Sequence, residues 1–218
     1  MALTEGLLFP ACAVNGFTQL EFGMQTNADK PELTLNPGVK SRPQYPPVSL
    51  NPAAQCQVFI ARKNTTGDKA GALLKPLMDE AEKSEKSLNI IPLVVGEDGD
   101  VISMSQLPQT ISSLPLASSF YLAGTEAFIW DVAKLICEAG FIMEQVHLLP
   151  PVNNERRLFC THCYAITEPV THSPAVCSGC GRHLLVRDHF SKIHRAYVGV
   201  QIDAEDPADL PEESEELC

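Results

Sequence analysis

Two pairs of closely spaced cysteines place the strongest constraint on how this chain can fold. Cys160 and Cys163 form one Cys-x-x-Cys pair, Cys177 and Cys180 form a second, and thirteen residues separate the pairs. Four thiolates at about 2.3 Å can surround one tetrahedral Zn²⁺, and each Cys-x-x-Cys turn supplies two of them. The pattern therefore predicts a structural zinc ribbon, in which two tight turns, or knuckles, on neighbouring hairpins close the metal shell.

The four cysteines allow other interpretations besides a zinc ion with four thiolate ligands. Four cysteines can also hold an iron–sulfur cluster, or they can be buried as free thiols. His162 lies inside the first pair and His183 follows the second, so either could replace a thiolate, although we expect both outside the shell. Gly179 and Gly181 provide the backbone freedom that a knuckle needs. A zinc with four cysteine ligands has no open position, so we expect it to support folding rather than catalysis.

The remaining cysteines indicate a reducing compartment. They are scattered along the chain at Cys12, Cys56, Cys137 and Cys218, whereas a disulfide framework would space them through a small secreted domain. No run of about 18 apolar residues is present, so we expect no membrane span. The apolar start carries Glu5 and no basic residues, which is unlike a secretory signal. We therefore expect a cytoplasmic protein.

The chain divides by composition into two small modules with extended ends. It has 218 residues, of which 44% are apolar, so a core is possible and global disorder is excluded. We predict an N-terminal region and Pro-rich connector at 1–54, an α/β domain at 55–150, the zinc ribbon at 151–200 and an acidic tail at 201–218. One further strand is expected at 17–23.

Short apolar runs alternate with helical spacing inside the α/β domain. Strands are predicted at 56–61, 88–95, 119–123 and 146–149, and helices at 67–86, 103–114 and 125–139. Pro76 predicts a kink or a later start in the first helix, and Pro108 a break in the second. This alternation predicts a small doubly wound parallel sheet covered on both faces.

Two loops at the carboxyl ends of predicted strands are candidate nucleotide sites. Arg62 and Gly67 belong to the first loop, and Gly124 and Thr125 to the second. A helix N-terminus with nearby cations and glycine can hold a phosphate, but neither G-x-G-x-x-G nor a P-loop is present. The alternative is an ordinary strand-to-helix loop. No catalytic group of residues emerges, and we expect Trp130 in the core.

The charge of −11 is unevenly distributed. Residues 201–218 hold eight acidic side chains and no Lys or Arg, whereas residues 151–200 hold six basic and three acidic side chains. The whole chain therefore disfavours duplex nucleic acid and anionic membranes as partners. We expect the tail to be solvated and disordered, or else to dock a basic partner.

The segment from Phe120 to Ile129, which continues to Gly140 and His147, resembles the last strand–helix–strand of ferredoxin-reductase-type NAD(P)-binding domains. Ala123 and Thr125 stand where that family has Cys and Pro, and its glycine-rich first turn is missing. The resemblance implies a derived domain that kept the reductase scaffold.

A second resemblance combines both modules. The α/β unit, the ribbon motifs CTHC and CSGCGRHLLVRDHFS, the later AYVGV and the earlier Ser41-Arg42-Pro43-x-Tyr45 together are similar to the DmmA-type subunit of bacterial dimethylamine monooxygenase. This resemblance covers about residues 40–200. It implies a subunit of a complex that uses NADPH and O₂ to convert dimethylamine to methylamine and formaldehyde.

The resemblance also implies a division of labour. The haem and the flavin/iron–sulfur reductase are expected on other subunits, because this chain lacks plant-type ferredoxin cysteine spacing and a distinctive haem ligand among its six histidines. The expected role is assembly or support of electron transfer. Two alternatives remain: a stand-alone NAD(P)H-binding reductase component, and a zinc-ribbon module that binds nucleic acid or protein.

Overall fold

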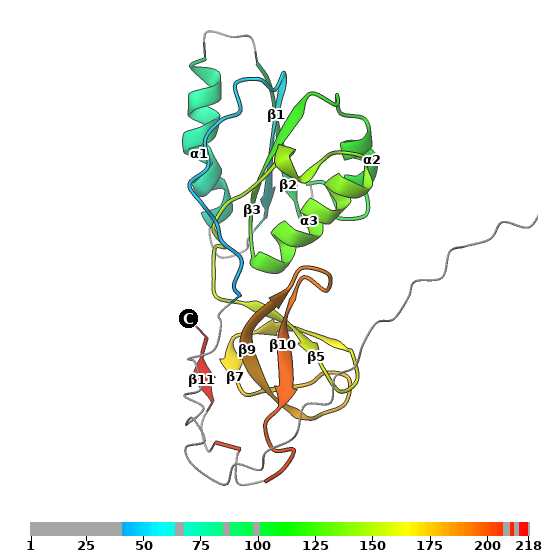
Figure 1. Ribbon diagram of the computed structural model, residues 1–218. Helices are drawn as coiled ribbons and strands as arrows, with labels where there is room; N and C mark the ends of the chain where they lie inside the picture. Colours follow the sequence, from blue (N-terminus) through cyan, green and yellow to red (C-terminus); the bar gives the residue numbers. More distant parts are fainter. Residues whose placement is uncertain are drawn as a thin grey trace, which may run out of the picture. The chain divides into compact units, whose positions relative to one another are not determined.

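The computed structural model describes residues 41–63, 68–84, 88–97, 101–206, 210–211 and 214–217 (Figure 1). Gly67 and the strand predicted at 17–23 therefore lie outside the described residues. Residues 37–218 form one compact unit, whose described part contains a four-stranded, a five-stranded and a two-stranded sheet. The four-part division that we draw from composition stays a prediction.

The four-stranded sheet is parallel throughout and has the strand order β2-β1-β3-β4. Its elements follow one another as β1 (Cys56–Arg62), α1 (Lys69–Glu82), β2 (Asn89–Val95), α2 (Leu107–Ser112), β3 (Ser118–Ala123), α3 (Glu126–Glu138) and β4 (Val146–Leu148), with a 3₁₀ turn at Met143–Gln145. The predicted parallel α/β arrangement is confirmed, with each strand and helix close to its predicted position.

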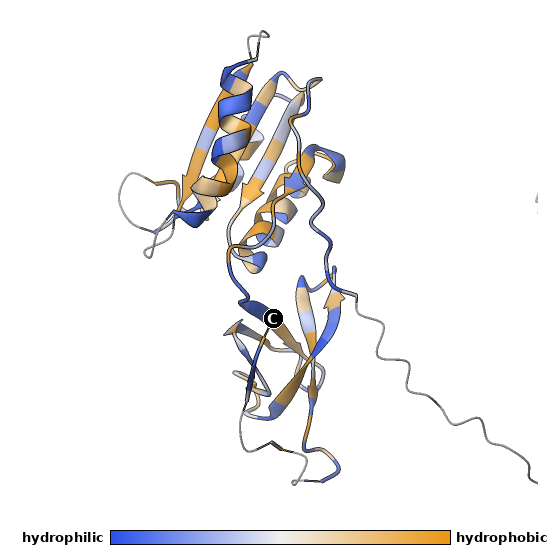
Figure 2. Ribbon diagram, turned by 90° about the vertical axis from the view of Figure 1, so that its left-hand side faces the viewer, coloured by the Kyte–Doolittle hydropathy of each residue, from blue (hydrophilic) through white to orange (hydrophobic). Residues whose placement is uncertain are grey.

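Both faces of this sheet are covered by helices (Figures 1 and 2). Alternate residues of β1 point to opposite faces, so Val58 and Ile60 pack with α2 and α3 while Phe59 and Ala61 pack with α1. All of β3 is buried, because this central strand lies under helices on both sides. The double covering explains why the strands are continuous apolar runs rather than alternating ones.

The helix boundaries depart from prediction at two prolines. α1 begins at Lys69, where the Asp68 carboxylate accepts a 2.7 Å hydrogen bond from the Gly71 N–H, and it runs through Pro76. The later start that Pro76 suggests is therefore wrong. α2 begins at Leu107, so Pro108 lies in the first turn, where its missing N–H leaves no helical hydrogen bond unmade.

The five-stranded sheet has the order β6-β5-β10-β9-β8. Its strands are β5 (Arg156–Cys160), β6 (Ile166–Val170), β8 (Ala175–Val176), β9 (His183–Ser191) and β10 (Ala196–Gln201). β5 and β10 are parallel, and the other pairs are antiparallel. The segment 183–200, which mixes apolar and basic residues, forms a hairpin of two strands.

Part of the acidic tail belongs to the fold, which corrects the expectation of a solvated appendage. β11 (Glu215–Glu216) pairs with β7 (His172–Ser173) in the two-stranded sheet. Leu217 then enters the core of the five-stranded sheet with 8% of its surface exposed, and its N–H donates to the carbonyl of Thr171 at 2.8 Å. The burial of Leu217 and the pairing of β11 with β7 together hold this end of the tail. In the described parts, we find no helix long and apolar enough to cross a bilayer.

Candidate metal centre and adjoining sites

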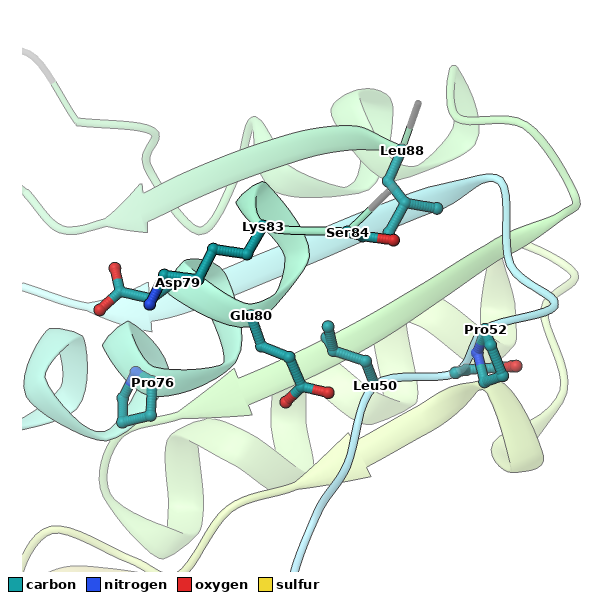
Figure 3. A pocket seen from close by; sticks show the side chains of 9 residues that line it. Leu50, Pro52, Pro76, Asp79, Glu80, Lys83, Ser84 and Leu88 are labelled. Carbon is teal, nitrogen blue, oxygen red and sulfur yellow. The ribbon is translucent and has the colours of Figure 1, made fainter. Parts of the chain in front are cut away.

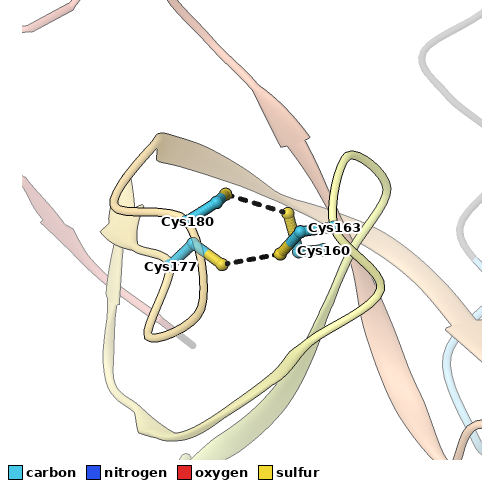
Figure 4. A group of neighbouring side chains, drawn as sticks. All are labelled: Cys160, Cys163, Cys177 and Cys180. Atoms are coloured by element: carbon cyan, nitrogen blue, oxygen red, sulfur yellow. Dashed lines mark hydrogen bonds between the residues drawn. The ribbon is translucent and has the colours of Figure 1, made fainter.

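The four predicted metal ligands lie together at one end of the five-stranded sheet (Figure 4). Their sulfur atoms are all within 4.8 Å of one another, with Sγ–Sγ distances of 3.6 Å for Cys163–Cys177 and 3.9 Å for Cys160–Cys180. Zn–S bonds of about 2.3 Å in a tetrahedron place sulfur atoms about 3.8 Å apart. The donor set and its spacing therefore fit a single metal ion.

The two knuckles repeat the same backbone hydrogen bonds. In the first, the Tyr164 N–H donates to the Cys160 carbonyl at 2.9 Å, and in the second, the Gly181 N–H donates to the Cys177 carbonyl at 3.0 Å. In each knuckle the residue after the second cysteine has a positive φ, 63° at Tyr164 and 71° at Gly181. The first knuckle joins β5 to β6 and the second joins β8 to β9, so the predicted placement on two hairpins is confirmed.

Gly179 is required by a close approach between the knuckles. A Cβ at this position would lie 2.5 Å from the Ala165 Cβ and 3.2 Å from the Cys163 Sγ. Contacts this short do not occur between real Cβ atoms. Any side chain at Gly179 would therefore push the two pairs of cysteines apart.

Backbone N–H groups favour the thiolate form in the second knuckle. Burial raises the pKa of Cys177, but the N–H groups of Cys180 and Gly179 together with neighbouring thiols outweigh it and lower the pKa to about 6. For Cys163, the N–H of Ala165 lowers the pKa, whereas burial and the other three thiols raise it to about 12. Four thiolates at these distances repel one another, and a divalent cation among them would remove that repulsion.

Neither nearby histidine joins the four sulfur atoms among the described residues. His162 Nδ1 lies 2.7 Å from Nη1 of Arg182, and His183 Nδ1 lies 3.4 Å from Oδ2 of Asp203. Both side chains thus have partners outside the cluster, as expected from the sequence.

A buried carboxylate links the two sheets. Glu126, in the first turn of α3, has 7% of its surface exposed. Its Oε1 accepts hydrogen bonds from the hydroxyl of Tyr45 at 2.5 Å and from the hydroxyl of Tyr197 on β10 at 3.3 Å. Trp130 Nε1 donates to the Tyr45 hydroxyl at 3.1 Å. Burial raises the pKa of Tyr45 most, and the hydrogen bond to Glu126 and its negative charge raise it further. Burial and the negative charge of Glu126 raise the pKa of Tyr197 in the same way.

The same helix holds the ribbon sheet by ion pairs one turn later. Asp131 on α3 accepts two hydrogen bonds from Arg157 on β5, at 2.8 and 2.6 Å. Arg195 Nε lies 3.2 Å from Asp131 Oδ1. Beside them, the rings of Trp130 and Phe190 pack with centroids 5.4 Å apart. Trp130, which we expect in the core, is only partly buried and packs against the cores of both sheets.

The segment before β1 binds both sheets. The Arg42 guanidinium donates to both carboxylate oxygens of Asp188 on β9 at 2.9 Å, and Arg156 also donates to Asp188, at 3.1 Å. The Ser41 N–H donates to the Asp188 carbonyl at 2.9 Å. Four residues later, Tyr45 reaches Glu126. The region that we expect to be an extended connector is extended here, and it fastens the two sheets together.

Two of the four candidate nucleotide residues line a cavity of about 570 Å³ at the carboxyl ends of β1, β2 and β3, whereas Gly67 lies outside the described residues. Arg62 and Thr125 line it together with Phe128. A Cβ at Gly124 would lie 2.5 Å from Cδ1 of Phe128, so this glycine makes room for a side chain of its own helix. Thr125 caps α3 by accepting from the Phe128 N–H at 3.4 Å. The carboxylate of Glu126 beside this helix end does not favour a phosphate there.

A larger, open pocket lies at the opposite end of the parallel sheet (Figure 3). It has a volume of about 950 Å³ and lies between the last turns of α1, which contribute Glu80 and Lys83, and the segments at Leu50 and Leu88. Parallel sheets bind ligands beyond the carboxyl ends of their strands. This pocket lies at the amino ends, so its size alone does not make it a ligand site.

Sequence reasoning identified the metal ligands but assigned no role to the residues that join the sheets. Glu126 and Tyr45 both fall within the motifs that carry the DmmA-type resemblance. A glutamate at the start of an otherwise apolar helix, and a tyrosine in a Pro-rich segment, were the available signals. Nothing in the sequence indicated that the two side chains meet.

Comparison with known proteins confirms the DmmA-type resemblance. Residues 157–200 match the family described as dimethylamine monooxygenase subunit DmmA-like, C-terminal domain. The chain is 27% identical over 167 residues to the heme-dependent oxidative N-demethylase delta subunit of Ectopseudomonas mendocina (strain ymp), a match that spans 77% of this chain and 91% of the relative.

Among solved structures, the chain is similar to phthalate dioxygenase reductase, described as a modular structure for electron transfer from pyridine nucleotides to [2Fe-2S]. The TM-score is 0.34 and the identity 13%, and the match covers 58% of this chain and 46% of the reductase chain. At this TM-score no property of the reductase is carried over.

Proposed function

We propose that this chain is a subunit of a multicomponent monooxygenase that demethylates dimethylamine to methylamine and formaldehyde. The observation that supports this most strongly is the match over 91% of a heme-dependent oxidative N-demethylase delta subunit. That match is longer than the ribbon, so it includes much of the α/β part as well. The name of the relative implies a complex with further subunits.

Within that complex, the proposed role is assembly or support of electron transfer, with the haem and the flavin/iron–sulfur reductase on other subunits. The conspicuous charged residues of the described parts are used to hold the fold. Asp131 and Asp188 are bound by arginines, and Glu126 accepts from two tyrosines. Residues committed to such contacts are poorly placed to perform acid–base chemistry. The cysteine usage is in keeping with a cytoplasmic location.

We propose further that the four cysteines hold one structural Zn²⁺. Their sulfur atoms lie within 4.8 Å of one another, which suits one ion, whereas a cluster would require several iron and sulfide atoms between them. All four positions of a tetrahedral shell would be filled by thiolates, so the ion would contribute to folding. Metal analysis of the purified chain tests this directly: one zinc per chain is expected, and iron with acid-labile sulfide would contradict it.

Two other functions are less well supported. A stand-alone NAD(P)H-binding component would use the loops at Arg62 and Gly124. The Phe128 ring lies against Gly124, and the Glu126 carboxylate lies in the first turn of α3, where it competes with a phosphate for the helix N-terminus. Calorimetric titration with NADPH would detect such binding. A nucleic-acid-binding ribbon would give a salt-sensitive gel shift with RNA.

Co-expression tests the proposed function. The full chain should co-purify with the haem-containing subunit and the reductase subunit of the oxidative demethylase. A variant with Cys177→Ser should lose both its metal and this association if the ribbon takes part in assembly. A wild-type chain that purifies alone, with correct metal content and folding, would contradict membership of the complex.

A further inference from the structure

One face of the ribbon sheet carries a row of apolar side chains. Leu158 and Cys160 on β5 are fully buried, so Phe159 between them points to the opposite face. Phe159 pairs with Ile166 on β6 and with Val198 on β10. Paired residues on neighbouring strands share a face. The three side chains therefore form a continuous row across β6, β5 and β10.

Aromatic and aliphatic side chains extend this row at both sides. The ring of His194 stacks on Phe159 with centroids 4.1 Å apart, and the ring of Tyr164 lies 5.9 Å from it. Ile193, next to His194, has 85% of its surface exposed, and Tyr164 has 73%. We call Phe159, Ile166, Val198, Tyr164 and His194, together with the exposed Ile193 in the adjoining turn, the ribbon face. Large apolar side chains gathered at one exposed place commonly mark an interaction site.

The charged residues around the ribbon face are mainly basic. Lys192 precedes Ile193 in the turn between β9 and β10, and Arg182 pairs with His162, which lies two residues before Tyr164 in the chain. Two acidic side chains in this region are held by Arg157, namely Glu168 on β6 at 2.7 Å and Asp131 on α3 at 2.6 Å. Residues 151–200 carry six basic and three acidic side chains, although the whole chain has a charge of −11. The part of the chain that carries the apolar row is therefore more basic than the rest of the chain.

We propose that the ribbon face is a docking surface for an acidic protein partner, namely a surface of another subunit of the complex with exposed apolar side chains ringed by Asp and Glu. The proposal rests on the proposed function and deepens it by naming the surface and the chemistry of its partner. Tyrosine and other large side chains at the centre of such a contact supply most of the affinity, and the basic surroundings set the orientation and the rate of association.

A protein partner fits this face better than RNA does. Ile166, Ile193 and Val198 offer nothing to a phosphate backbone, and binding to nucleic acid rests on many more cations than the few present here.

The test compares variants of the full chain that is co-expressed with the haem-containing subunit and the reductase subunit. The double variant Tyr164→Gly/Ile193→Ser removes the two most exposed members of the ribbon face. Glycine suits the positive φ of Tyr164, so the fold and the metal content should be retained. The matched control is Leu116→Ser, which removes a 77% exposed leucine from the loop before β3.

The expected result is that the wild type and Leu116→Ser assemble, while the double variant binds roughly tenfold more weakly or is lost from the complex. Binding by the wild type should weaken as salt is raised. If all three chains assemble equally, the docking surface is refuted and the proposed function stands. If the wild type itself does not assemble, both fall. Dimerisation through this face, or RNA binding that the double variant loses, would also overturn the proposal.

Discussion

Removing the hydroxyl of Tyr45 should loosen the contact between the two sheets. In Tyr45→Phe, the buried Glu126 carboxylate loses its 2.5 Å hydrogen bond and keeps only the 3.3 Å bond from Tyr197, and Trp130 Nε1 loses its acceptor. A hydrogen bond to a charged group contributes about 1.5–3 kcal/mol. We therefore expect the free energy of unfolding to fall by about 2–3 kcal/mol.

Urea-induced unfolding of the metal-loaded chain, followed by circular dichroism and tryptophan fluorescence, measures this loss. Trp130 is the only tryptophan in the chain, and it lies at the contact itself. Tyr164→Phe is the matched control, because that tyrosine is 73% exposed. Surface changes of this kind usually alter stability by less than about 0.5 kcal/mol.

A double-mutant cycle separates the charge of Glu126 from its packing. If the charge makes the Tyr45 bond strong, Tyr45→Phe should cost only about 1 kcal/mol in a chain that already carries Glu126→Gln, since neutral hydrogen bonds are weaker. Equal costs in the two backgrounds would refute the argument from charge. A Tyr45→Phe cost no larger than that of Tyr164→Phe would refute the whole account of this contact.

The other predictions concern pH, the metal centre and the tail. The fold raises the pKa of Tyr45 and Tyr197 above the ordinary 10.0. Above about pH 10 the unfolded chain therefore loses these protons before the folded chain does, so the free energy of unfolding should fall there and be unaffected by these groups at lower pH. Unfolding measured on both sides of this pH should show a smaller fall in the double variant Tyr45→Phe/Tyr197→Phe. Gly179→Ala should reduce the zinc content of the purified chain, because the new Cβ would lie 2.5 Å from the Ala165 Cβ. Gly181→Ala has open space around it but a φ of +71°, so it should lower the free energy of unfolding by about 1–2 kcal/mol while the metal is kept. Equal zinc loss in both variants would contradict the distinction. Leu217→Ala should lower the free energy of unfolding by about 2 kcal/mol and make the acidic tail more sensitive to protease. An unchanged cleavage rate would show that Leu217 and β11 do not hold the tail against the ribbon sheet.

The metal centre was predictable from the sequence because its ligands are local. Each Cys-x-x-Cys pair is brought together by a single turn, so only the meeting of the two turns depends on the rest of the chain. Gly181 was recognisable for the same reason, as a residue whose backbone suits a tight turn. Tyr164 was not, since its positive φ is unusual for a tyrosine and is imposed by the knuckle.

The parallel sheet was predictable at the level of its elements. Buried strands such as β3 are continuous apolar runs, and α3 has apolar residues at helical spacing, so both are recognisable one segment at a time. The hairpin of β9 and β10 was missed, because the segment 183–200 mixes apolar and basic residues and its turn carries no glycine or proline.

By itself, the sequence determined the four cysteines of the candidate metal centre, the order of strands and helices in the α/β part and the DmmA-type resemblance. Each of these depends on spacing along the chain. Only the tertiary structure decided that Tyr45, Glu126 and Tyr197 meet, that Leu217 anchors the acidic tail and that six residues form the ribbon face. These groupings join side chains that are far apart in the chain, such as Tyr45 and Glu126, which are 81 positions apart. No local pattern records which distant residue will fill a given space or satisfy a given buried charge.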